Sequence, residues 1–270
     1  MVLYDVIGKT YAQTRRSDPR IAGKLREILA SSPASTIVDI GAGTGSYALA
    51  LAEHGYHVLA VEPSAMMRSQ AIAHPEIEWI NGSVDSLPVP DRSVDAAIIM
   101  LAFHHFPDYR QALREIHRVV GNGQIVLFTY DPAMIAGFWL TEYFPSFVKD
   151  VESTFLPMPQ LLDEIQVVTG NIANVIPFPL PHDLSDSFAA VGWARPELYL
   201  ESSIRNGISS FAKIDDSELN SGLSCLAKDL KSGEWDRKYG YLRQQSQYDV
   251  GYCFVHCPIK NDQQFQIQNF

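Results

Sequence analysis

The sequence predicts an α/β fold: a mostly parallel, doubly wound sheet of seven strands with helical and aromatic-rich insertions. Three observations lead to this prediction. Short apolar runs alternate with helical patterns through the first half of the chain, one run leads directly into a glycine-rich turn, and residues 96–101 are uniformly apolar. A strand that is apolar on both sides is typical of a parallel sheet covered by helices, and strand–helix alternation produces such sheets through right-handed crossovers.

The first half of the chain supplies the elements with the clearest local signals. Asp18 and Pro19 are typical of a helix start, while Gly41 ends a strand and Gly55 and Gly121 end helices. Apolar residues recur at helical spacing, and the strand runs are short and continuous. In order, the predicted elements are a helix from Asp18, a strand at 36–40, a helix at 46–53, strands at 57–61, 77–80 and 94–101, a helix at 108–120 and a strand at 124–130.

The pattern loosens after residue 131. A helix is predicted at 159–169, and strands at 174–180 and 249–257 complete the seven. The stretches 132–157 and 183–247, together with about the first 20 residues, fit no simple crossover. We interpret them as insertions at the ligand end of the sheet, within one domain that spans residues 1–270.

Composition narrows the class of protein. The net charge of −10 argues against a nucleic-acid partner, since such proteins present clustered Lys and Arg. No apolar stretch reaches the roughly 18 residues of a membrane span, and the first residues lack the apolar core of a secretion signal. The three cysteines are too few and odd in number for a disulfide framework. We therefore expect a soluble cytoplasmic protein with neither a membrane nor a nucleic acid as partner.

The glycine-rich turn at 41–45 discriminates between cofactors. A dinucleotide site has the pattern G-x-G-x-x-G, whose third glycine would stand at Ser46. The chain instead has Gly41, Gly43 and Gly45, preceded by Asp39. A carboxylate at this place would repel a pyrophosphate but suits a ligand that carries an ammonium group. An NAD-dependent oxidoreductase is therefore the weaker alternative.

Four stretches, in this order, carry a resemblance to a known family: VDIGAGTG, AVEPSAMM, GSVDSLPVPDRSVDAAIIMLAFHHF and LREIHRVVGNGQIVLFTYDP. Together they resemble the successive motifs of class I S-adenosylmethionine-dependent methyltransferases, in particular the small-molecule branch that includes the ubiquinone and menaquinone biosynthesis enzymes. The resemblance covers residues 37–131 and implies a Rossmann-like fold with S-adenosylmethionine as cofactor. Outside this span the resemblance weakens.

The resemblance also implies roles for particular residues in binding the cofactor. Backbone around Gly41 and Gly43 would hold the methionine part, with Asp39 at its ammonium end. Glu62 would accept from both ribose hydroxyls, and Asp85 from the adenine amino group. Pro63 and Met67 would line the adenine, Leu101 would contribute backbone, and Tyr11 and Arg15 would cap the methionine carboxylate. The implied cofactor set is Tyr11, Arg15, Asp39, Gly41, Ala42, Gly43, Glu62, Pro63, Met67, Asp85, Ser86 and Leu101.

The implied reaction is in-line displacement of a methyl group from the sulfonium to a small-molecule acceptor. The protein mainly aligns the partners and excludes water, and an acceptor of high pKa also needs a base. The candidate catalytic residues are His105, after the fourth strand, and His182 with Asp183, after the sixth. Pocket shaping by His105 and turn formation by His182 and Asp183 are the alternatives. Oxygen, nitrogen, carbon and sulfur all stay open as the atom that is methylated.

Residues outside the motifs allow more than one interpretation. The aromatics of 132–157 fit a helical face that either packs in a core or forms a lid. Trp193, Arg195 and Tyr199 form either an acceptor site or a packed corner. Cys253 and Cys257 would lie more than roughly 10 Å apart along an extended strand, too far to share a zinc ion. We interpret these cysteines as buried small hydrophobic residues and expect no metal.

Two functions of different class therefore follow from the sequence. We expect a methyltransferase that acts on a small molecule. A catalytically silent regulatory protein that binds S-adenosylmethionine is the alternative, because the same motifs would hold the cofactor in both.

Overall fold

The computed structural model describes residues 15–31 and 33–260, which form two compact units. The sheet unit consists of residues 19–31, 33–129, 159–176 and 254–260. The helical unit consists of residues 15–18, 130–158 and 177–253. Each unit is thus assembled from segments that are far apart in the sequence.

The sheet unit contains the strands and helices that the sequence predicts, with two short helices in addition. Its elements are α3 (Pro19–Leu29), β1 (Thr36–Ile40), α4 (Ser46–Ala52), β2 (His57–Val61), α5 (Ala65–Arg68), β3 (Ile77–Ile80), β4 (Ala96–Met100), η2 (Phe103–His105), α6 (Tyr109–Val120), β5 (Gln124–Tyr130), α8 (Met158–Thr169), β6 (Asn174–Pro177) and β9 (Tyr252–Pro258). The strands form one seven-stranded sheet in the order β3-β2-β1-β4-β5-β9-β6.

The pairing of the strands shows that the sheet is mixed. β1 pairs in parallel with β2 and β4, and β4 pairs in parallel with β5. The Ile259 amide donates to the Gly123 carbonyl, and the Asp131 amide donates to the Gly251 carbonyl. The start of β9 therefore lies beside the end of β5, and β9 is antiparallel. The prediction of a mostly parallel seven-stranded sheet is confirmed.

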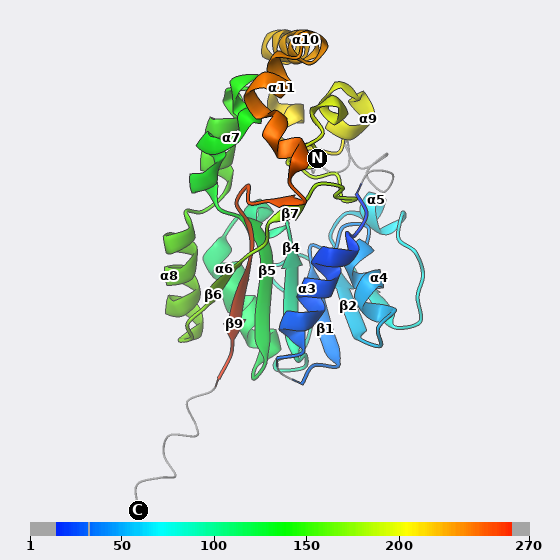
Figure 1. Ribbon diagram of the computed structural model, residues 1–270. Coiled ribbons are helices and arrows are strands. Elements are labelled where there is room, and N and C mark those ends of the chain that lie inside the picture. Colours follow the sequence, from blue (N-terminus) through cyan, green and yellow to red (C-terminus); the bar gives the residue numbers. More distant parts are fainter. Residues whose placement is uncertain (1–14, 32, 261–270) are drawn as a thin grey trace, which may run out of the picture. The chain divides into compact units, whose positions relative to one another are not determined.

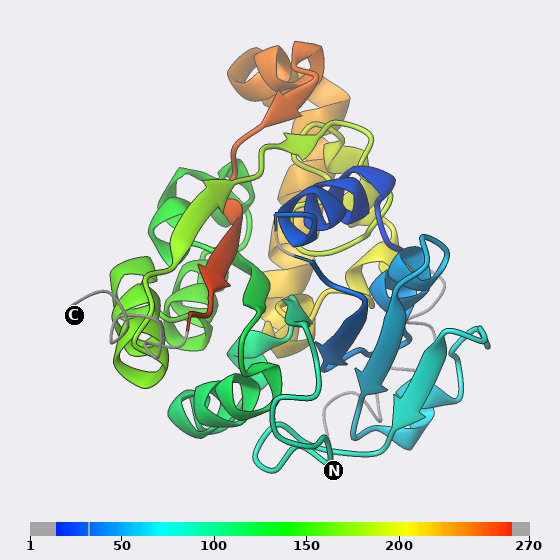
Figure 2. The ribbon, with the colours of Figure 1, turned by 90° about the horizontal axis from the view of Figure 1, so that it is seen from below.

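Helices cover both faces of this sheet. α3 and α6 lie on opposite faces of the strands, as the two views of the ribbon show (Figures 1 and 2). The central strands β1, β4 and β5 each carry a residue that is 0% exposed: Ile37, Ile98 and Leu127. Because these strands lose water on both faces, apolar burial is the main force that holds the sheet unit together.

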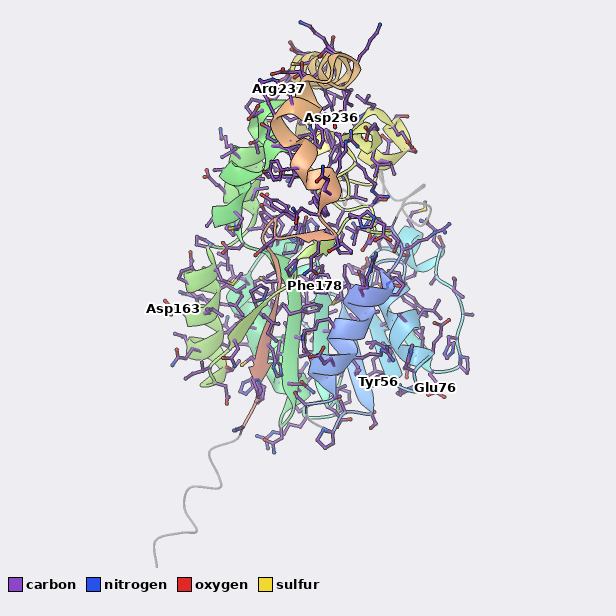
Figure 3. All side chains as sticks on the ribbon, in the orientation of Figure 1. Tyr56, Glu76, Asp163, Phe178, Asp236 and Arg237 are labelled. Carbon is purple, nitrogen blue, oxygen red and sulfur yellow. The ribbon has the colours of Figure 1, made fainter. Side chains whose placement is uncertain are left out.

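The two ends of the sheet differ in what they carry. Tyr56 and Glu76 mark the amino ends of β2 and β3 (Figure 3). The glycine turn follows the opposite, carboxyl end of β1. In open α/β sheets, ligands bind beyond the carboxyl ends of the strands. The functional site is therefore expected at the end opposite to Tyr56 and Glu76.

The strand predicted at 174–180 is split in the structure. β6 ends at Pro177, and β7 (Leu180–Pro181) pairs instead with β8 (Gln247–Tyr248) in a second, two-stranded sheet. Pro177 and Pro179 lack an amide N–H, so the chain here cannot continue one hydrogen-bonded ladder.

The strand predicted at 249–257 begins later, at Tyr252. The Asp249 carboxylate accepts from the Gly251 amide at 2.9 Å, and Gly251 has a φ of 105°. This local turn occupies the residues that would otherwise have begun the strand.

The helical unit consists mainly of short helices. Its elements are η3 (Pro132–Gly137), η4 (Trp139–Glu142), α7 (Ser146–Thr154), β7, η5 (Pro196–Leu200), α9 (Ser202–Arg205), η6 (Phe211–Lys213), α10 (Asp216–Ser232), α11 (Glu234–Tyr239), η7 (Gly240–Gln244) and β8. The sequence predicts helical, aromatic-rich insertions here, but it gives no bounds for these helices, because the stretches that contain them show no regular alternation.

Aromatic packing holds the helical unit together. The Trp139 ring lies 5.7 Å from Tyr199 and 5.3 Å from Trp235, measured between ring centroids. The Trp139 indole N–H donates to the Trp193 carbonyl at 2.9 Å. Trp193 and Tyr199 are both 0% exposed, and the Tyr199 hydroxyl donates to the Ala189 carbonyl at 2.7 Å. These residues therefore form a packed corner in the core of this unit.

The three cysteines differ in their exposure. Cys253 and Cys257 are buried, as predicted, and Cys225 is exposed on α10. Within residues 15–31 and 33–260, no helix combines the length and apolarity that crossing a membrane requires.

Gly45 and Gly55 offer a test of how tightly β3 packs. Both have positive φ, of 76° and 87°, but a Cβ at Gly45 would lie 2.6 Å from the Trp79 ring, whereas nothing lies within 4 Å at Gly55. Gly45→Ala should lower the free energy of unfolding by about 3 kcal/mol, and the control Gly55→Ala by about 1 kcal/mol. Urea unfolding of both variants measures the difference, and equal losses would contradict the packing argument.

Candidate functional site

A buried carboxylate at the end of β2 joins the two turns beside it. The Glu62 carboxylate accepts from the Gly43 amide at 3.0 Å through Oε2 and from the Ser64 amide at 2.8 Å through Oε1. Burial raises the pKa of Glu62 above its usual value, and the two amides offset part of this rise. Each carboxylate oxygen keeps a lone pair for a further donor, so Glu62 can accept from two hydroxyl groups without losing its amides.

The glycine turn directs its amides toward β2. The Gly41 and Ala42 amides both donate to the Val61 carbonyl, at 2.9 and 3.2 Å, and the Gly43 amide is taken by Glu62. A phosphate site at such a turn needs amides that point at the ligand. Because these three amides are already engaged, the geometry disfavours a dinucleotide and agrees with the missing glycine at Ser46.

Gly41 also brings the ends of β1 and β4 together. Its φ is 73°, and a Cβ at this position would lie only 2.7 Å from the Ala102 Cβ. Leu101, just before Ala102, has a φ of 52°, a left-handed conformation that is uncommon for a residue other than glycine. This conformation ends β4 at Met100, one residue before the predicted end. Strained backbone of this kind occurs often at functional sites.

Asp39 is a second buried acid at this end of the sheet. Its side chain is 2% exposed, and its Oδ1 atom meets no hydrogen-bond donor among the described residues. Burial, and then the negative charge of Glu62, raise the pKa of Asp39 to about 7. A buried oxygen without a partner marks a place where a cationic or hydrogen-bonding ligand would be stabilised.

Residues around Glu62 supply an apolar surface. Met67 in α5 is 3% exposed, and its Cε would lie 3.5 Å from a Cβ at Gly43. Ser64 caps α5 by accepting from the Met67 amide at 3.3 Å. Pro63, between Glu62 and Ser64, is exposed.

The loop after β3 places Asp85 at the surface. The Ser83 hydroxyl donates to Asp85 Oδ2 at 2.7 Å, and the Gln111 amide group donates to the Asp85 carbonyl at 3.2 Å. Arg118 on α6 holds the following residues by donating to the carbonyls of Leu87 and Val89, each at 2.9 Å. Ser86 is exposed beside Asp85. The loop is thus anchored, while the Asp85 carboxylate stays accessible.

The two neighbouring histidines of η2 contact each other. The ring centroids of His104 and His105 are 3.9 Å apart, and the planes are inclined by 53°. His105 is exposed and His104 is half-buried. His105 is therefore the more accessible of the two imidazoles.

The remaining predicted site residues belong to the helical unit. His182 and Asp183 are both exposed, with Nδ1 of His182 3.9 Å from Oδ1 of Asp183. Arg15 pairs with the buried Asp186, with 2.5 Å between Nε and Oδ1, and lies over the Phe188 ring at 5.9 Å. Tyr11, which the sequence pairs with Arg15, lies outside the described residues.

Sequence reasoning missed two residues that the structure places beside predicted ones. Ser64 holds Glu62 through its amide, and its N-cap position, three residues before Met67, was a readable signal. Asp186 pairs with Arg15 across 171 residues of sequence, and no local pattern indicates it.

Known proteins resemble this chain in sequence. The pattern of a family described as "Methyltransferase domain" matches residues 38–128. The ubiquinone/menaquinone biosynthesis C-methyltransferase UbiE of Rubrivivax gelatinosus is 40% identical over 89 residues, which cover 32% of this chain and 36% of that protein. A demethylmenaquinone methyltransferase of Lysinibacillus sphaericus is 34% identical over 106 residues, covering 37% and 45%. The alignments thus span less than half the length of these two curated relatives.

A crystal structure extends the similarity to nearly the whole chain. It is of a protein from Anabaena variabilis, assigned as a methyltransferase from an antibiotic biosynthesis pathway. The two chains are 45% identical with a TM-score of 0.86, over 91% of this chain and 99% of the other. Shared motifs, a shared fold and near-complete alignment lead to one conclusion: the chain belongs to the class I S-adenosylmethionine-dependent methyltransferases.

Proposed function

We propose that this protein transfers a methyl group from S-adenosylmethionine to a small-molecule acceptor. The cofactor supplies a methyl group that its sulfonium makes electrophilic. The observation that carries the proposal is the Glu62 carboxylate, held by two amides with a free lone pair on each oxygen at the carboxyl end of β2. In this position Glu62 accepts from the two ribose hydroxyls.

The other residues of the sheet unit fit the same ligand. The unpartnered Oδ1 of Asp39 suits the ammonium of the methionine part, and Gly41 and Gly43, with Ala42 between them, leave room for it along the backbone. Met67 and Pro63 offer apolar surface for the adenine. Further contacts complete the proposed cofactor set: Asp85 and Ser86 to the adenine amino group, Leu101 through backbone, and Tyr11 and Arg15 to the methionine carboxylate.

The acceptor is proposed to be a small organic molecule. The names of the relatives refer to quinone biosynthesis and to an antibiotic pathway, and both involve small organic products. We propose that the helical unit, which lies outside the 38–128 family match, recognises the acceptor. His105 is proposed as the residue that takes a proton from the acceptor, and His182 with Asp183 as acceptor contacts.

A transfer experiment tests the proposal directly. The purified chain is incubated with S-[methyl-³H]adenosylmethionine and a small-molecule extract of the source cells, and the extract is then separated from protein. Label in the small-molecule fraction supports the proposal and leads to the acceptor. Tight cofactor binding with no transfer would instead favour the catalytically silent regulatory protein.

Glu62→Gln should weaken binding of S-adenosylmethionine by about 100-fold, since two hydrogen bonds to a charged acceptor contribute about 3 kcal/mol together. Titration calorimetry measures the loss. Glu78→Gln, at an exposed position of β3, is the matched control and should leave the affinity unchanged. Equal affinity for all three proteins would contradict the role of Glu62.

His105→Ala should lower turnover of the labelled acceptor by about 100-fold, which is typical for loss of a general base. The affinity for S-adenosylhomocysteine should change little. A variant with normal turnover would show that His105 only shapes the site.

Asp39→Asn should stabilise the protein without ligand at pH 8. Because the folded pKa of about 7 exceeds the ordinary value of 3.8, the stability of the natural chain falls as pH rises from about 4 through 7. The variant avoids this loss, so its free energy of unfolding should be higher at pH 8 by up to about 4 kcal/mol, and nearly equal only near pH 3.5, below the ordinary pKa. Asp163→Asn, at an outward-pointing residue of α8 (Figure 3), is the control and should show no such pH dependence.

A further inference from the structure

Asp39 differs from the other buried acid of the site. Glu62 accepts from two amides, whereas Oδ1 of Asp39 meets no donor among the residues that the structure describes. Asp39 is 2% exposed, and the charge of Glu62 opposes its ionisation. A buried carboxylate without a hydrogen bond or a counter-ion is strongly disfavoured relative to its protonated form. The cofactor would bring a cation to this place.

We propose that binding of the cofactor is coupled to the release of a proton from Asp39, which makes this carboxyl group selective for adenosyl ligands that carry an ammonium group. The inference rests on the proposed function, in which Asp39 lies at the ammonium end. The O–H bond of the protonated carboxyl group breaks, the proton passes to the buffer, and an ion pair with the ammonium group takes its place. Ligands that lack this group release no proton.

The size of the effect follows from the titration of Asp39. Burial, and then the charge of Glu62, raise its pKa to about 7, so the unliganded group is largely protonated at pH 6. If only the carboxylate binds the ammonium, the affinity falls as pH drops below this pKa. Between pH 7.0 and 5.5 the expected decrease is about 15-fold, with release of about 0.9 proton per ligand at pH 6. In this range the ligand's own α-amino group stays protonated, because its pKa is about 8.

Titratable groups on the elements around Asp39 could also make binding depend on pH. The β-strand partners of Asp39, Ala60 and Ile98, carry no charge. The titratable or charged groups on the elements around them are His57 at the amino end of β2, Glu62 after β2, Tyr47 on α4, Arg68 on α5, His104 and His105 in η2, and Arg20, Lys24, Arg26 and Glu27 on α3. Protonation of Glu62, or of His104 or His105, is what the experiment must distinguish from protonation of Asp39. A pH dependence caused by Glu62 would appear with every ligand that has a ribose. A pH dependence caused by a histidine would remain in an Asp39 variant.

Calorimetry with two ligands distinguishes these sources. S-adenosylhomocysteine carries the amino-acid end, whereas 5′-methylthioadenosine has the same ribose and adenine without it. Each ligand is titrated at pH 5.5, 6.0 and 7.0, and at pH 6.0 in both phosphate and Bis-Tris. The difference in heat between the two buffers gives the number of protons released. The proteins compared are the natural chain, Asp39→Asn, and the controls His104→Gln and His105→Gln.

The expected result is a 15-fold pH dependence and proton release with S-adenosylhomocysteine, and neither with 5′-methylthioadenosine. Asp39→Asn should bind S-adenosylhomocysteine more weakly at pH 7.0, with no pH dependence. Both histidine controls should keep the pH dependence and the proton release of the natural chain. A dependence that disappears in a histidine control, or that appears equally with 5′-methylthioadenosine, would overturn the inference. Tight binding with no proton released would overturn it while leaving the proposed function intact. No binding of either ligand at any pH would instead count against the proposed function.

Discussion

Glu62, together with Arg68, connects the carboxyl ends of three strands. Through the Gly43 amide it holds the turn that follows β1, and through the Ser64 amide it holds the turn that follows β2. Arg68 connects this network to β3, because its guanidinium donates both to the Glu62 carbonyl and to the side-chain oxygen of Asn81, just after β3. One acidic residue and one basic residue thus connect the loops of β1, β2 and β3. Without the carboxylate, the Gly43 amide and the buried Ser64 amide would lose their acceptor, which is destabilising in itself.

The same site contains a cost to stability. Asp39 and Glu62 are two buried acids whose like charges oppose each other, and Asp39 lacks a hydrogen bond on Oδ1. Such an arrangement does not help the chain to fold. It is explained if the site is complementary to a ligand that brings hydroxyl donors to one acid and a positive charge to the other. Stability and binding then place opposite demands on Asp39, as is common in binding sites.

The helical unit depends on a different force. Its aromatic residues pack against one another, and the indole and phenol groups of Trp139 and Tyr199 satisfy their polar atoms with backbone carbonyls. Trp193 is fully buried in this packing, so it is not available as an acceptor contact. His182 and Asp183, by contrast, stay exposed on this unit. A packed aromatic core allows the surface residues of a fold to change without loss of the fold.

The sequence alone determined the elements whose signals are local. Strands at 36–40, 57–61, 77–80 and 124–130 have the predicted bounds, and α3, α4, α6 and α8 agree with their predictions to within one or two residues. Continuous apolar runs and helix caps act over a few residues, so they can be read without the fold. The glycine turn and the acid at the end of β2 were readable for the same reason.

Only the tertiary structure decided what depends on residues far apart in the chain. β9 lies antiparallel between β5 and β6, and each of the two units consists of segments that alternate along the chain. The tertiary structure paired Arg15 with Asp186, 171 residues away, and left Oδ1 of Asp39 without a donor. The physical reason is that burial and hydrogen-bond satisfaction are set by every neighbour in space. An acid in a motif predicts a ligand, but whether that acid is paired, charged or protonated follows from packing that no local pattern contains.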